Sequence, residues 1–131
     1  MPFIKILIFI VLIIVNISSY SEEIEILFEI NNKIYTSNDL KNRKIFLTVE
    51  NRLINSNNPL DDLISITLYN EEFNKRELKI DKKIVKEYYI KIKNDIDKLD
   101  NNSKKKIIFN NLSKKKILNQ IKFDLKRKIL I

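Results

Sequence analysis

The feature that most constrains the fold is a run of regularly spaced apolar side chains in the second half of the chain. They recur three and four positions apart, which places them on one face of a helix. The residues are Ile84, Val85, Tyr88, Tyr89, Ile92, Ile96 and Leu99. Asp81 stands where the first turn would begin, and its carboxylate is suited to cap that turn. The spacing therefore predicts an amphipathic helix that ends near residue 99.

The segment near the N-terminus has a different period. Apolar side chains at Ile24, Ile26, Phe28 and Ile30 alternate with Glu25, Leu27 and Glu29. That alternation is typical of a half-buried strand. Asn31 and Asn32 follow, and asparagine accepts a positive φ more easily than most residues with a side chain. We therefore expect a tight turn into a short second strand, Lys33 to Tyr35.

A first helix is expected directly after this hairpin. Thr36 or Ser37 would cap it, and Asp39 in its first turn complements the helix dipole. Helical spacing continues to about Ile54, where the polar residues 55–58 break it. Its expected buried side chains are Leu40, Leu47 and Ile54.

The next helix, expected from Leu60 to about Arg76 with Pro59 at its start, is apolar on two sides. One stripe is formed by Leu60, Leu63, Ile64 and Leu68, and the opposite side by Ile66, Tyr69 and Phe73. Such a helix either lies in the centre of the fold or offers one stripe as a binding surface. The central position is favoured, because amphipathic spacing more often means core.

Two further helices are expected after a loop at residues 100–102. Ser103 and Ser113 would cap them, and each serine is followed by the same letters, KKKI. The apolar positions are Ile107, Ile108, Phe109 and Leu112 in the shorter helix and Ile117, Leu118, Ile121, Leu125 and Ile129 in the last. Lysines in a first turn oppose the helix dipole, a local conflict that the spacing does not explain.

These segments together predict the fold class. It is mainly α, with a short N-terminal β-hairpin followed by four to five helices, in one domain over residues 22–131. The chain has no cysteine, so no disulfide can staple a domain of this size. Its apolar core must therefore hold it together.

Residues 1–21 have the pattern of a secretory signal peptide. Lys5 gives a positive start, and Ile6 to Val15 is an unbroken apolar run that is too short to span a bilayer as a helix. Ser19 and Ser21 place small side chains where a signal peptidase cleaves, so cleavage is expected after Ser21. The alternative is an uncleaved anchor that tethers the hairpin to the membrane.

The composition excludes most enzyme chemistry. Without histidine and cysteine there is no imidazole base, no Ser-His or Cys-His nucleophile pair and no His-ligated metal. Without glycine there is no phosphate-cradling loop of the usual kind. Catalysis by two carboxylates stays formally possible, but the carboxylates are scattered beside lysines. The sequence therefore predicts no enzyme, no cofactor, no metal and no catalytic residue.

The charge of +8 is unevenly spread. Residues 22–100 carry 14 basic and 16 acidic groups, whereas residues 101–131 carry 10 basic groups against Asp124 alone. A basic third of this kind can attract nucleic acid, an anionic membrane surface or acidic polypeptide. The alternative is that the lysine excess has no function and reflects compositional drift, because isoleucine, lysine and asparagine dominate the chain.

The order of these features resembles the N-terminal domain of the SurA family. The stretches that carry the resemblance are the Asn31-Asn32 turn, Ile34 to Leu40 (IYTSNDL), Leu60 to Ile64 (LDDLI), Leu78 to Val85 (LKIDKKIV) and Leu118 to Lys122 (LNQIK). The similarity spans Glu22 to Ile131. One departure is Glu77, which stands where the family usually has a glycine, so that turn must be made without an easy left-handed residue.

The resemblance implies a location and a function. SurA-like proteins are periplasmic chaperones of Gram-negative bacteria that hold unfolded outer-membrane precursors. Larger members continue into parvulin isomerase domains and a C-terminal helix that packs on the N-domain. This chain carries neither, so isomerase activity is not expected and the apolar groove under that helix is expected to be open.

The leading hypothesis is therefore a non-enzymatic periplasmic holdase that binds aromatic-rich segments of outer-membrane precursors, with Ile66, Tyr69 and Phe73 as candidate peptide-binding residues. The first alternative is an adaptor or scaffold subunit that binds no client itself and pairs with a separate envelope isomerase or assembly factor. A second copy of the chain and a separate parvulin-type protein are the other partners considered. The second alternative is a cationic membrane-surface protein that uses the basic clusters 104–106, 114–116 and 126–128. A cytosolic nucleic-acid binder would require the signal peptide to be misassigned, and no nucleic acid partner is expected.

Overall fold

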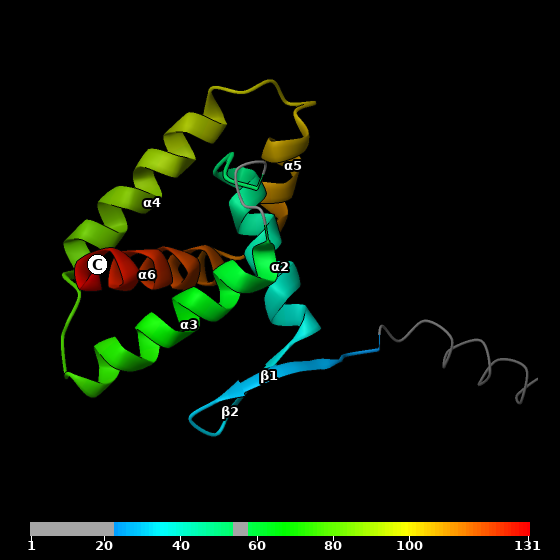
Figure 1. Ribbon diagram of the computed structural model, residues 1–131. Coiled ribbons are helices and arrows are strands. Elements are labelled where there is room, and N and C mark those ends of the chain that lie inside the picture. Colours follow the sequence, from blue (N-terminus) through cyan, green and yellow to red (C-terminus); the bar gives the residue numbers. More distant parts are fainter. Residues whose placement is uncertain (1–22, 54–57) are drawn as a thin grey trace, which may run out of the picture.

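The computed structural model describes residues 23–53 and 58–131. Its described part holds a two-stranded antiparallel sheet followed by five helices (Figure 1). In chain order the elements are β1 (Ile26–Ile30), β2 (Lys33–Thr36), α2 (Ser37–Val49), α3 (Pro59–Lys75), α4 (Lys82–Asp97), α5 (Lys104–Asn111) and α6 (Lys114–Leu130). The predicted fold class, mainly α with a short N-terminal hairpin, is confirmed. The expected leader, its cleavage after Ser21 and the buried position of Ile54 lie outside the described residues.

The hairpin turns through the two asparagines. Asn31 and Asn32 have φ angles of 49° and 63°. A two-residue type I′ turn needs both angles positive, so the turn predicted from this pair is confirmed. Phe28 pairs with Tyr35 across the strands, and their rings stack with centroids 4.9 Å apart.

β1 is less buried than its alternation predicted. A register irregularity between Ile26 and Phe28 interrupts the pairing of the two strands. Ile24 and Ile26 are exposed, whereas Phe28 and Ile30 are half-buried. An irregularity of this kind bends a strand and changes which side chains face the body of the protein. The expected half-buried face is therefore present only near the turn.

α2 begins as expected and ends early. Thr36 is its N-cap, and the Thr36 backbone N–H donates to the Asp39 carboxylate at 2.7 Å. The helix ends at Val49 instead of near residue 54, because Asn51 takes a positive φ of 57°. The Arg52 N–H then donates back to a carbonyl of the last turn at 2.8 Å, which is the Schellman pattern.

α3 ends in the same way, with Glu77 in the left-handed region at φ 55°. The Glu77 N–H donates to the Asn74 carbonyl at 3.0 Å, and the Leu78 N–H donates to the Phe73 carbonyl at 3.3 Å. This motif commonly brings the side chain after the turn against the last turn of the helix. A glutamate therefore takes the left-handed position itself, and the chain is directed from α3 toward α4.

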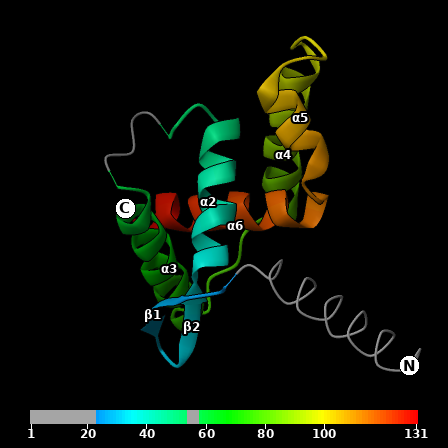
Figure 2. The same ribbon diagram turned by 90° about the vertical axis from the view of Figure 1, so that its right-hand side faces the viewer.

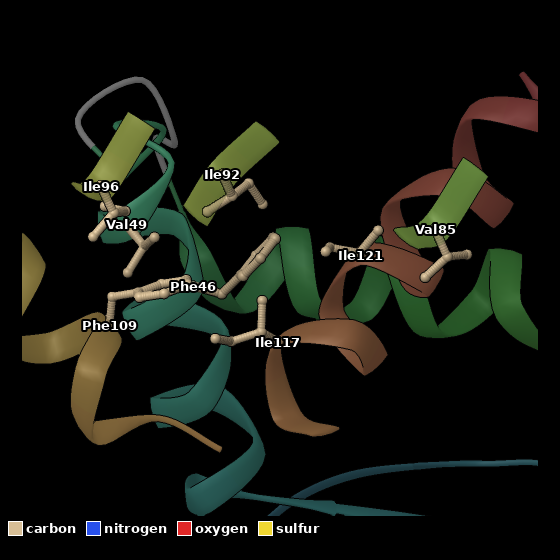
Figure 3. Packing of buried hydrophobic residues seen from close by; sticks show 8 residues of the cluster. All are labelled: Phe46, Val49, Val85, Ile92, Ile96, Phe109, Ile117 and Ile121. Carbon is tan, nitrogen blue, oxygen red and sulfur yellow. The ribbon is translucent and has the colours of Figure 1, made fainter. Parts of the chain in front are cut away.

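α6 is the central helix of the described fold. It packs against both α3 and α4 and also contacts α2 (Figures 1 and 2). The main cluster of buried side chains comes from α2, α4, α5 and α6 (Figure 3), and it comprises Phe46, Val49, Val85, Ile92, Ile96, Phe109, Ile117 and Ile121. Helical spacing pointed to all of these except Phe46 and Val49, and Leu47 is buried as predicted.

The central position expected for α3 is wrong, because α6 holds it. α3 packs against α6 and α2 with a single buried face, and that face includes Leu63, Ile66 and Phe73. Leu68, from the same predicted stripe as Leu63, is 52% exposed. A helix that packs on one side needs only one apolar face. The buried face therefore takes residues from both predicted stripes, and Leu68 is left at the surface.

A lysine at the start of α5 caps the end of α4. Lys106 Nζ donates to the carbonyl oxygens of Asp97 at 3.3 Å and Leu99 at 3.1 Å. The last carbonyls of a helix lack partners in their own helix and carry partial negative charge, so a cation there is favourable. The unfavourable position of this lysine in the α5 dipole is therefore offset by its contact with α4.

Candidate binding groove

The three residues predicted to bind peptide do not form a common exposed surface. Ile66 is 0% exposed and Phe73 is 2% exposed, so both side chains belong to the interior. Tyr69 is half-buried and lines a shallow hollow with Leu68. This corrects the site prediction for Ile66, since a side chain that packs between helices cannot contact a client while the fold is intact.

An open groove of about 600 Å³ lies where the end of α3, the linker to α4, α4 itself and α6 meet. Its apolar lining consists of Phe73, Leu78, Ile80, Val85, Tyr89 and Leu118. Leu78 is 42% exposed, although it sits beside the buried Phe73. Of the predicted binding residues, only Phe73 contributes to this groove.

The rim of the groove is basic. It carries Lys79, Lys82, Lys86, Lys114, Lys122 and Lys126, and no aspartate or glutamate is among the residues that line it. The described ion pairs engage other basic residues, and none of these six lysines forms one within residues 23–53 and 58–131. The groove therefore joins an apolar surface to unneutralised positive charge.

Lys126 is the most constrained of these lysines. Its Nζ donates to Asn70 Oδ1 at 2.7 Å and Asn74 Oδ1 at 3.2 Å, and it lies 5.4 Å from the centre of the Phe73 ring. Partial burial lowers the Lys126 pKa, and the charge of Lys122 adds to that effect. Neutral amides hold this ammonium group in place without cancelling its charge.

Lys114 is placed over the second aromatic ring of the groove. Its Nζ lies 5.1 Å from the centre of the Tyr89 ring, and that ring stacks on Phe109 with centroids 6.3 Å apart. A cation over an aromatic face is attracted by the ring quadrupole. Both aromatic rings of the groove therefore have a lysine over one face.

Two partly buried acidic side chains away from the groove, Asp62 and Asp124, hold three helices together. Arg43 is 0% exposed and donates from Nε to Asp62 at 2.6 Å and from Nη2 to Asp124 at 2.7 Å. Arg127 donates to Asp62 at 2.8 Å, and Arg52 to Asp124 at 2.7 Å. The network links α2, α3 and α6 and lies apart from the groove lining.

Two carboxyl groups of this region have shifted pKa values of opposite sign. Partial burial acts to raise the pKa of Asp62, but the hydrogen bonds from Arg43 and Arg127 outweigh it and hold that pKa below its usual value. Burial raises the pKa of Glu50, and its Oε1 is the only buried side-chain polar atom without a hydrogen-bond partner in the described part of the chain. Tyr88 donates to the other oxygen of Glu50 at 3.2 Å.

The groove depends on a segment that spacing alone does not single out. Leu78, Lys79 and Ile80 lie between the helix expected to end near Arg76 and the cap at Asp81, and all three line the groove. The available signal was their alternation of apolar and basic side chains next to an unusual helix end. Among the described residues, no group of acidic side chains is arranged to hold a metal ion, and no helix is long and apolar enough to cross a bilayer.

Comparison of the chain with family models, with curated proteins and with solved structures found no match.

Proposed function

We propose that this protein is a non-enzymatic chaperone of the holdase type, which binds unfolded polypeptide segments in the groove between α3, α4 and α6. The observation that carries the proposal is a groove of about 600 Å³ with an apolar lining that the described chain leaves open. Ligand-binding clefts typically have volumes of this order and mainly apolar walls.

The location and the clients of the chaperone are proposed from the sequence. The leader at residues 1–21 supports export, and the likeness to the SurA family supports the periplasm of a Gram-negative bacterium and unfolded outer-membrane precursors as clients. Such clients expose aromatic and aliphatic side chains before they fold. An open groove lined by Leu78, Ile80 and Leu118 can bury such side chains without requiring one fixed sequence.

The groove is tested by changing an exposed apolar residue within it. Leu78→Gln removes part of the apolar surface, and we expect it to weaken client binding about fivefold, since burial of part of a leucine contributes about 1 kcal/mol. The measurement is light scattering from a chemically unfolded outer-membrane barrel protein that is diluted into buffer with the chaperone present.

Leu68→Gln is the matched control, because Leu68 is a similarly exposed leucine at the shallow hollow that also contains Tyr69. We expect this variant to suppress aggregation as well as the wild-type protein does. A loss confined to Leu68→Gln would move the site to the hollow around Tyr69. Absence of suppression by the wild-type protein would refute the holdase proposal, and circular dichroism of each variant checks that the helices persist.

A second candidate function is binding to an anionic membrane surface. It is favoured by the exposure of Lys104, Lys115 and Lys128, which lie on α5 and α6 outside the groove. Co-sedimentation with anionic vesicles that disappears at high salt would support this alternative, because screening weakens attraction between exposed charges.

A further inference from the structure

We infer that the groove selects clients by charge, and that its ligand is an extended acidic polypeptide segment in which aromatic or aliphatic side chains stand next to carboxylates. This inference rests on the proposed function and adds the chemical class of the client. The structural basis is the juxtaposition of an apolar floor with six lysines that form no ion pair in the described part of the chain.

The placement of the lysines indicates several anionic groups rather than one. Lys79 belongs to the linker, Lys86 to α4, and Lys114 and Lys126 to opposite ends of α6. Cations on several sides of a groove complement a chain with repeated carboxylates, whereas an amphiphile with a single head group would leave most of them unpaired. Charge complementarity therefore favours a polypeptide with several acidic residues.

Among the six lysines, Lys126 is the one best positioned to bind an anionic group. Asn70 and Asn74 accept its hydrogen bonds at 2.7 and 3.2 Å, and both acceptors are uncharged. Glu71 is the carboxylate whose field reaches Lys126, and it is already paired with Lys33 at 2.8 Å. An arriving carboxylate would therefore meet a fixed, half-buried cation, which makes a stronger ion pair than a mobile surface lysine does.

The two aromatic rings of the groove are covered by lysines and lie in a recess, which disfavours nucleic acid and membrane surfaces as the anionic partner. Lys114 lies over the Tyr89 ring and Lys126 over the Phe73 ring, and Phe73 is itself buried, so the rings are not open platforms for stacked bases. The apolar residues lie in a recess between helices, whereas a membrane surface would require them to protrude.

The test compares two labelled peptides and two sets of variants. One peptide carries phenylalanines separated by glutamates, and the other has each glutamate replaced by glutamine. The groove set is Lys86→Gln, Lys114→Gln and Lys122→Gln in one protein. The control set is Lys104→Gln, Lys115→Gln and Lys128→Gln, which removes the same charge from exposed lysines of α5 and α6 outside the groove.

Fluorescence anisotropy should show the acidic peptide bound more tightly than the glutamine peptide by wild-type protein. The groove set should raise the Kd of the acidic peptide about tenfold and the control set less than about twofold, as expected for three partly screened ion pairs. The Kd of the glutamine peptide should be nearly the same for all three proteins.

Several outcomes would overturn the inference, and they are distinguishable from failure of the holdase proposal. Equal weakening by both sets would show that net charge acts, not the groove. Equal affinity for both peptides would contradict the charge selectivity but not the holdase function. If neither peptide binds and aggregation is not suppressed, both the charge selectivity and the holdase function are refuted.

Two further outcomes would identify a different occupant of the groove. A dimer that the groove set dissociates would identify a second copy as the occupant, and vesicle binding lost only in the groove set would identify lipid head groups.

Discussion

At the scale of single residues, the buried Arg43 is the feature with the largest expected effect on stability. Its guanidinium group donates to Asp62, Gln120 and Asp124, which come from α3 and α6. Arginine can make this set of bonds because its donors are held in a planar fork, whereas a lysine presents one point charge. The side chain thereby fixes α2 relative to two other helices.

Arg43→Lys should therefore lower the free energy of unfolding by about 2 to 4 kcal/mol, because one ammonium group in a fully buried site cannot donate to Asp62, Gln120 and Asp124 together. Arg52→Lys is the control, because Arg52 is half-buried and its exchange should cost less than about 1 kcal/mol. Urea unfolding followed by circular dichroism measures both. Equal losses for the two variants would contradict the assigned role of Arg43.

The free energy of unfolding should fall at acidic pH as Asp62 becomes protonated. Its pKa is lowered by folding from an ordinary value of 3.8, so its contribution is present above that pH and is lost as the pH falls through the lowered pKa. Asp62→Asn should be less stable than wild type by about 2 kcal/mol near neutrality, with the difference shrinking below about pH 4. Urea titrations from acidic to neutral pH measure the trend.

Glu50→Gln is the control for Asp62→Asn, because its stability difference from wild type should change with pH in the opposite direction. Folding raises the Glu50 pKa above its ordinary value of 4.5, so wild type gains relative to this variant at low pH and loses that gain as the pH rises through the raised pKa. Parallel pH trends for the Asp62 and Glu50 variants would show that one of the two environments is misassigned.

At the scale of elements, the two left-handed helix ends decide where the chain turns. Asn51 ends α2 and Glu77 ends α3, both in Schellman motifs. The second motif also positions Leu78 at the groove. A glutamate in the left-handed region costs about 1 kcal/mol relative to glycine, so this position is not optimised for stability.

Glu77→Gly should therefore raise the free energy of unfolding by about 0.5 to 1 kcal/mol, and Glu77→Ala should not raise it, because alanine keeps the Cβ that opposes positive φ. Thermal unfolding of the two variants measures the difference. Destabilisation by glycine would contradict the left-handed conformation at this position.

The hairpin should be the least stable described element. It extends from the helical body (Figure 1), it holds only two strands, and its side chains reach α3 through the pair of Lys33 with Glu71 at 2.8 Å. A two-stranded hairpin has little stability of its own. Hydrogen exchange should therefore be faster for amides of β1 and β2 than for those of α6, and equal protection would show that the hairpin opens only with the whole fold.

At the scale of the whole molecule, we propose that residues 1–21 are a cleaved leader, so that the mature protein diffuses instead of being tethered to the membrane. Expression of the full chain in a Gram-negative host should give a mature protein that begins at Glu22, because the apolar run before Ser21 has the length of a cleaved signal. Intact mass and N-terminal sequencing of the periplasmic fraction measure this. Recovery of residues 1–21 in the membrane fraction would favour the anchor.

Much of the fold follows from local patterns, and much of the site does not. The asparagine turn, the caps at Thr36 and Asp81 and the stripe of α4 depend on neighbours in sequence, so they were predictable. Of the predicted binding residues, Ile66 and Phe73 lie on the buried face of α3, which packs against α6 and α2, and the contact with α6 joins segments far apart in the chain. Helical spacing identifies an apolar face but not the element that covers it.

The sequence alone determined a mainly helical chain with an N-terminal hairpin, a composition poor in catalytic groups and a basic C-terminal third. Only the tertiary structure decided that α6 is central, that Arg43 is buried and that lysines from the linker, α4 and α6 surround one apolar groove. The physical reason is range. Periodicity and capping act within a few residues, whereas burial and charge clustering depend on which distant segments pack together.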